Sequence, residues 1–211
     1  VEGSKTFIPM SLISAAGKTA EELSARGAKF EKLHRGGWEP HARVKDQDTD
    51  GVAAEVIYPS VGMEICNIPD IDLKQACMEA YNRWLTEFCA PYPHRLIGLG
   101  QCAVRTPADG IKELEAIKQA GFKGVMLPGV PSKEDYAHEM YKEFFDAVVE
   151  LELVPSFHIL TSGEGLRQNF RGSKINAFMS VVRGNQELMS MFVFDGIFMR
   201  HPKLKIVSAE A

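Results

Sequence analysis

Short apolar runs alternate with longer amphipathic stretches along most of this chain, and this alternation constrains the fold more than any other feature. The runs are rich in Val, Ile, Leu and Phe without strict polar alternation, which indicates strands buried on both faces of a sheet. We expect strands at 52–58, 96–102, 124–128, 154–160 and 203–210. The helical stretches between them imply parallel strands joined by right-handed crossovers.

Helices are expected where apolar residues recur three and four positions apart. The clearest example spans 73–90, and others are expected at 41–50, after Pro107, around 141–149, at 175–191 and at 194–200. Thr19 followed three residues later by Glu22 is typical of a capping box at a helix start.

Two architectures accommodate five such units: a partial (β/α)₈ barrel and an open doubly wound sheet. The open sheet is usually accompanied by a GxGxxG or GxxxxGK[ST] turn, and the sequence contains neither. Gly98 and Gly100 form a GxG, but no third glycine follows. The missing fingerprint argues against the open sheet, but the pattern alone leaves both architectures open.

Composition excludes several classes of function. The 211 residues are 45% hydrophobic and 25% charged, as in soluble globular proteins, which argues against disorder. The net charge of −4 comes without a run of Lys or Arg, so we expect neither nucleic acid nor a membrane as a partner. The four cysteines form no CxxC pair, which fits small buried side chains in a cytoplasmic protein.

The C-terminal ends of parallel barrel strands hold the reactive groups, and this rule selects His158 and Glu210. His158 ends an apolar strand and precedes the polar, glycine-containing loop 161–165. An imidazole there can bind a metal or act as a base, although a hydrogen-bonded core histidine fits as well. Glu210 ends the last strand, where a carboxylate can move a proton or lie solvated at a frayed end.

Other polar and aromatic residues give weaker signals. Tyr58 and Trp38 are candidates for lining a substrate pocket, although packing is the more common role for each residue taken singly. We expect four histidines to lie at the surface, namely His34, His41, His94 and His138. His201 precedes the last strand and so belongs to the opposite face of the barrel, where chemistry is not expected.

Several motifs together resemble the amidohydrolase-related family, in the branch of aminocarboxymuconate-semialdehyde decarboxylase and the resorcylate-type decarboxylases. The similarity covers about residues 36–211. The matching segments are 36–40 (GGWEP), 42–43 (AR), 45–46 (KD), Asp48, 50–52 (DGV), 55–60 (EVIYPS), 80–82 (AYN), 84–85 (WL), 95–98 (RLIG), 121–124 (GFKG), 155–159 (PSFHI), 196–198 (GIF) and 200–207 (RHPKLKIV).

The resemblance implies a metal-dependent TIM-barrel enzyme. Members of the family hold a divalent metal, for which we expect zinc here, through an HxH pair on the first strand, a mid-barrel histidine and a late aspartate. His158 matches the mid-barrel histidine. No HxH pair occurs in the sequence, and Glu210 stands where the decarboxylases often have a histidine. The chain is therefore expected to be a fragment lacking the first and last strands, with residues 1–35 an irregular excursion and 36–211 the partial barrel.

The resulting hypothesis is a metal-dependent hydrolase of a small organic substrate, with His158 as metal ligand, Glu210 as catalytic acid or base, and Tyr58 and Trp38 at the substrate. Non-oxidative decarboxylation remains an alternative, as does an inactive chain without a complete metal site. A Schiff-base lyase would need a lysine at a strand's C-terminal end, whereas Lys123 and Lys205 begin strands. By resemblance, a homodimer is also possible.

Overall fold

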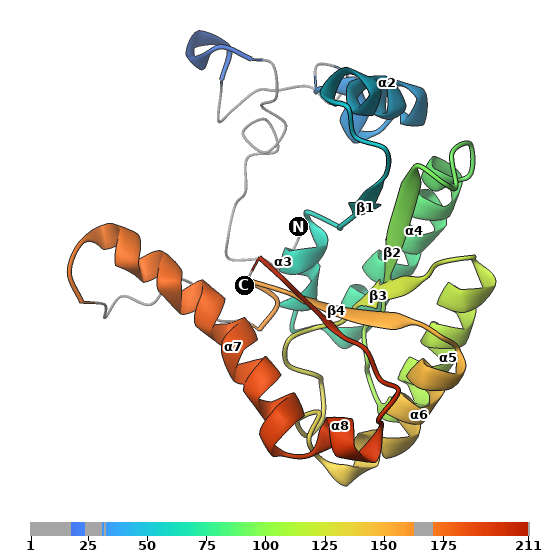
Figure 1. Ribbon diagram of the computed structural model, residues 1–211, viewed down its shortest axis with the longest axis vertical. Coiled ribbons are helices and arrows are strands. Elements are labelled where there is room, and N and C mark those ends of the chain that lie inside the picture. The colour runs from blue at the N-terminus through green and yellow to red at the C-terminus, as the bar shows by residue number, and fades with distance from the viewer. Residues whose placement is uncertain (1–17, 24–30, 32, 163–170, 211) are drawn as a thin grey trace. The chain divides into compact units, whose positions relative to one another are not determined.

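The computed structural model describes residues 18–23, 31, 33–162 and 171–210 (Figure 1). These residues contain five strands in the sheet order β1-β2-β3-β4-β5. The strands are β1 (Glu55–Ile57), β2 (Leu96–Gln101), β3 (Gly124–Met126), β4 (Val154–His158) and β5 (Val207–Ala209). Strands β2 to β5 pair in parallel, each with the next strand in the sequence.

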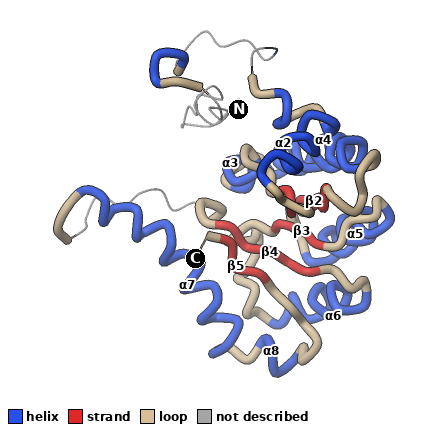
Figure 2. The backbone as a smooth tube through the Cα atoms, turned by 45° about the horizontal axis from the view of Figure 1, so that its top comes forward, coloured by secondary structure: helices blue, strands red, loops and turns tan. Residues whose placement is uncertain are grey.

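This strand order decides between the two architectures that the sequence allowed. A doubly wound sheet reverses its strand order at a switch point, whereas a (β/α) barrel adds each strand beside the previous one. Helices connect the successive parallel strands, as Figure 2 shows. The fold is therefore α/β and corresponds to part of a (β/α)₈ barrel, as predicted.

The described helices agree with most of the expected ones. The α-helices are α2 (Pro40–Asp50), α3 (Gly62–Cys66), α4 (Ile71–Cys89), α5 (Pro107–Gln119), α6 (Lys142–Glu150), α7 (Met179–Phe194) and α8 (Ile197–Arg200). Short 3₁₀ turns lie at η1 (Ala20–Glu22), η3 (Arg35–Gly37), η4 (Glu139–Tyr141) and η5 (Lys174–Phe178). None of these helices combines the length and apolar character needed to cross a membrane.

Some element bounds differ from the predicted ones. The strand expected at 52–58 is confined to Glu55–Ile57, and that expected at 203–210 to Val207–Ala209. The prediction that a helix begins at Phe194 was wrong, because α7 ends at Phe194 and α8 begins only at Ile197. Gly196, with a left-handed φ of 72°, separates the two helices. The sequence analysis also missed α3, because five residues are too few to show a helical period.

The contacts divide the chain into two compact units, residues 1–56 with 87–97 and residues 57–86 with 98–211. The predicted domain boundary between residues 35 and 36 stays a prediction. In the first unit, Glu39 caps α2 by accepting hydrogen bonds from the backbone N–H groups of His41 and Ala42. Arg43 donates to Glu55 at 2.8 Å, which ties this helix to the following extended segment.

In the second unit, one face of the sheet packs against helices. Gly98 and Gly100 let the helices approach β2 closely, because a Cβ atom at Gly98 would lie 2.8 Å from the Leu85 side chain and one at Gly100 would lie 3.0 Å from Ile117. An aromatic cluster continues this core beside β4. Its members are Tyr136, Tyr141, Phe144, Phe145, Phe157 and Phe192, all of them buried.

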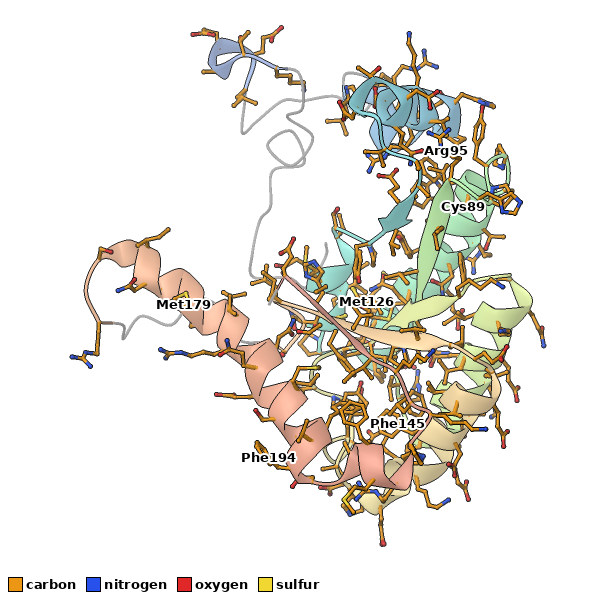
Figure 3. All side chains as sticks on the ribbon, in the orientation of Figure 1. Cys89, Arg95, Met126, Phe145, Met179 and Phe194 are labelled. Carbon is orange, nitrogen blue, oxygen red and sulfur yellow. The ribbon has the colours of Figure 1, made fainter. Side chains whose placement is uncertain are left out.

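The other face of the sheet carries the residues that matter for chemistry. The parallel register aligns Gln101, Met126 and Ser156 across β2, β3 and β4, so their side chains project on the same side. Met126, which Figure 3 labels, packs against Ile65 and Cys66 of α3. Along β4, His158 lies two residues beyond Ser156 and therefore on this same face.

Candidate functional site

His158 is held in one orientation at the end of β4. Its side chain is 8% exposed, and its Nδ1 lies 3.0 Å from the carbonyl oxygen of Ile159. Because a carbonyl oxygen can only accept, Nδ1 donates the hydrogen in this contact. In a neutral ring this tautomer leaves Nε2 with the lone pair by which a histidine binds metal or accepts a proton.

Glu210 follows β5 directly and faces this nitrogen. The parallel register pairs His158 with Ala209, which brings Glu210 to the same edge of the sheet. The Oε1 atom of Glu210 lies 3.7 Å from Nε2 of His158, and the Glu210 side chain is 63% exposed. The two residues predicted from their places at strand ends therefore lie beside each other, with the carboxylate accessible to solvent.

Tyr58 lies beside His158. Its ring centroid lies 5.4 Å from that of His158, and the planes are tilted by 54°. The Tyr58 hydroxyl shares a hydrogen bond of 2.8 Å with the Ser156 hydroxyl. This bond holds the hydroxyl end of the side chain, while the ring contacts His158. This arrangement fits the predicted position of Tyr58 near a substrate, while its role in binding one stays a prediction.

Trp38 belongs to the first compact unit. There the Arg35 guanidinium carbon lies 5.9 Å from the centroid of the indole ring, within the range of a cation–π contact. A role for Trp38 in lining the substrate pocket stays a prediction.

Three amide and hydroxyl side chains hold the strand ends in place. Asn185 of α7, which is buried, donates to the carbonyl oxygens of Phe157 and Ala209 at 3.1 and 3.0 Å. It thereby links β4 to β5 immediately beside His158 and Glu210. The Thr161 hydroxyl donates to the His158 carbonyl at 2.8 Å, and the Asn67 amide donates to the Leu160 carbonyl at 2.7 Å.

These supporting residues were missed in the sequence analysis, although one signal was present. Asn185 occupies the buried stripe of α7 together with Val181, Leu188 and Phe192, at steps of four, three and four. A polar residue in such a stripe needs a hydrogen-bond partner, since burial without one is costly. The sequence could have marked Asn185 as unusual, but not shown which carbonyl groups it joins.

Left-handed backbone marks the same edge of the sheet. Among described non-glycine residues, φ is positive at Val104, Glu152, Leu160 and Glu210, with values of 51°, 50°, 68° and 59°. Three of them follow β2, β4 and β5 within three positions, whereas Glu152 precedes β4. Such conformations are unfavourable for residues with a Cβ atom and tend to gather at functional sites.

The remaining histidines have other surroundings than the cluster formed by His158, Glu210 and Tyr58. As predicted, His34, His41, His94 and His138 are exposed. His201 is buried at the start of the segment leading to β5, where its Nδ1 lies 3.0 Å from Asp146 Oδ1. That position agrees with the expected structural placement on the opposite face.

The described residues fit a divalent metal in part. His158 meets the usual requirement for a ligand, because its second ring nitrogen is fixed by a backbone carbonyl. A closed site needs three or four protein ligands. Within 18–23, 31, 33–162 and 171–210, no three His, Cys, Asp or Glu side chains are grouped to hold a metal ion. These ranges thus supply one fitting ligand position and not a complete site.

Comparison with protein families gives one match over most of the chain. The family described as Amidohydrolase (Amidohydro_2) matches residues 34–211. Similar solved structures include an amidohydrolase from Mycobacterium avium subsp. paratuberculosis K-10, with a TM-score of 0.70 and 21% identity over 84% of this chain and 49% of that one.

Two further similar structures are decarboxylases by name. 2,6-Dihydroxybenzoate decarboxylase from Rhizobium has a TM-score of 0.63 and 20% identity over 95% of this chain and 62% of that one. 5-Carboxyvanillate decarboxylase from Novosphingobium aromaticivorans DSM 12444, complexed with manganese and 4-hydroxy-3-methoxy-5-nitrobenzoic acid, has a TM-score of 0.63 and 21% identity over 79% of this chain and 47% of that one. This chain thus spans about half to three-fifths of these proteins, and at such identities the likeness establishes the fold.

Proposed function

Because the chain belongs to the amidohydrolase family, whose pattern covers residues 34–211, we propose that the whole protein is a metal-dependent hydrolase of a small organic substrate. The observation that carries this proposal is the pairing of His158 with Glu210: Nδ1 of the ring is held by the Ile159 carbonyl, and Nε2 lies 3.7 Å from an accessible carboxylate oxygen. A nitrogen ligand beside a base is the combination that metal-assisted hydrolysis uses.

Each residue has a distinct role in the proposed reaction. When bound, a divalent cation, zinc or manganese, would polarise the bond to be broken. His158 offers Nε2 as one ligand, and the Ile159 carbonyl orients the ring through Nδ1. Glu210 takes a proton from the attacking water and can return it to the leaving group. Tyr58 and Trp38 are the candidates for contact with the substrate.

Decarboxylation is a second candidate, and a specific observation favours it. Two of the similar solved structures are decarboxylases of hydroxylated benzoates. In that reaction the Glu210 carboxyl group would deliver a proton to the ring carbon that loses CO₂. Release of CO₂ from 2,6-dihydroxybenzoate or 5-carboxyvanillate would support decarboxylation, whereas hydrolysis of ester and amide substrates without CO₂ release would support the hydrolase.

Metal content tests the role of His158. We expect His158→Ala to lower bound zinc or manganese in the whole protein at least about tenfold and to abolish turnover. Element analysis after dialysis against metal-free buffer measures this loss. His138→Ala is the matched control, because His138 is exposed and caps a 3₁₀ turn by accepting from the Met140 N–H.

The outcomes separate the alternatives. Unchanged metal content and rate in His158→Ala would remove His158 from the mechanism. If the 211-residue chain retains no metal and has no activity while the whole protein has both, the chain by itself is the inactive alternative that the sequence allowed.

A further inference from the structure

A cavity of about 700 Å³ opens in the second unit among the loops that follow β2, β3 and β4. The segment joining α3 to α4 forms another wall of it. The polar and charged residues that line it and bear on its chemistry are Lys74, Arg105, Thr106, Ser132, Lys133 and Ser162. These loops follow the C-terminal ends of the strands, so the cavity lies at the edge of the sheet where barrel enzymes bind ligands.

Lys74 is the unusual member of this lining. The residue as a whole is 8% exposed, although lysines are rarely buried to this extent without an anionic partner. No described hydrogen bond or ion pair within 18–23, 31, 33–162 and 171–210 involves its ammonium group. Burial lowers the pKa of Lys74, which is the expected response to a charge withdrawn from water.

The neighbouring thiol does not neutralise this lysine. Cys66 also lines the cavity and acts electrostatically on Lys74. Burial raises the pKa of Cys66 to about 12, so the thiol stays protonated near neutral pH. A protonated thiol carries no negative charge, and Lys74 is left without an anionic partner among these lining residues.

The remaining charges around the cavity are positive as well. Arg105 pairs with Asp72, which is itself exposed, while Lys133 is an exposed cation on the loop after β3. No Asp or Glu occurs among the residues described as lining the cavity. The hydroxyl groups of Ser132 and Ser162 add hydrogen-bond donors. Cations and neutral donors around a hollow form an environment that favours an anion.

We propose that this cavity is a binding site for a small oxyanion, the carboxylate or phosphate group of an organic ligand, with Lys74 as its central charged contact. The bound oxyanion would supply Lys74 with a counter-charge that no residue described as lining the cavity provides. Charge-assisted hydrogen bonds between an ammonium group and an oxyanion are among the stronger polar contacts in proteins. Neither His158 nor Glu210 is among the residues described as lining the cavity, and binding of an oxyanion there does not require the function proposed for them.

Calorimetric titration of the purified chain with inorganic phosphate and with succinate tests the proposal. We expect wild-type protein to bind at least one of them, and Lys74→Met to weaken that binding at least about tenfold. Methionine keeps most of the apolar stem, which favours a folded variant. Lys123→Met is the matched control, because Lys123 is an exposed lysine before β3, away from the cavity lining, and should leave binding unchanged.

A second measurement keeps the test valid if Lys74→Met fails to fold. In wild-type protein labelled at lysine, the Lys74 side-chain resonance should shift on addition of the anion that binds. Tighter binding of phosphate than of succinate would indicate a phosphorylated ligand. Tighter binding of succinate would indicate a ligand with a carboxylate group. The titration is repeated in His158→Ala, where binding should persist. If neither anion binds wild-type protein, or if Lys74→Met binds as well as wild type, the proposal is wrong.

Discussion

At the scale of single residues, the reaction depends on whether the Glu210 carboxylate moves a proton. Glu210→Gln keeps the shape of the side chain and removes its basicity, so we expect turnover of the wild-type substrate to fall by about 10²–10⁴-fold. Metal content should stay unchanged, because His158 is untouched. Steady-state kinetics with parallel element analysis measures both, and Glu150→Gln at an exposed position is the control. Equal rates in Glu210→Gln and wild type would exclude proton transfer by this residue.

A second carboxylate should affect stability rather than activity. Burial raises the pKa of Glu113, although its Oε2 accepts a hydrogen bond from the Ala103 N–H at 2.6 Å. A carboxyl group with a raised folded-state pKa favours the folded protein most below its unfolded pKa, and this contribution is lost as pH rises through the folded value. Glu113→Gln keeps an acceptor oxygen and cannot ionise. We expect denaturant titrations to show the variant gaining stability relative to wild type as pH rises from 4 to 8; no change in the difference with pH would contradict this.

At the scale of elements, the aromatic cluster decides how firmly α6 and α7 hold the sheet. Phe145 of α6 is 1% exposed, whereas Phe194 at the end of α7 is 84% exposed, and Figure 3 labels both. We expect Phe145→Ala to lower the free energy of unfolding by about 3–5 kcal/mol and Phe194→Ala by less than about 0.5 kcal/mol. Urea denaturation of the two variants measures the difference. Similar losses in both would mean that the cluster does not stabilise these elements as described.

At the scale of the whole molecule, the predictable features were those that depend on repetition or on position along a strand. The series of apolar runs gave the parallel order, and the rule that chemistry gathers at strand ends selected His158 and Glu210, which lie 3.7 Å apart. What depends on contacts between distant residues was not predictable. The Asn185 amide joins carbonyl groups 28 and 24 residues away, and no local pattern specifies those partners. The helix α3 was too short for periodicity to reveal.

The left-handed backbone at Val104, Leu160 and Glu210 has a consequence for how such a protein can change. Each of these conformations costs of the order of 1–3 kcal/mol, and the rest of the chain must compensate for it. Glycine at these positions would relieve the strain, but it would also free the loops that aim the reactive groups. Selection for resistance to heat would therefore favour relief of the strain at these positions, whereas selection for catalytic precision would favour keeping the strained residues.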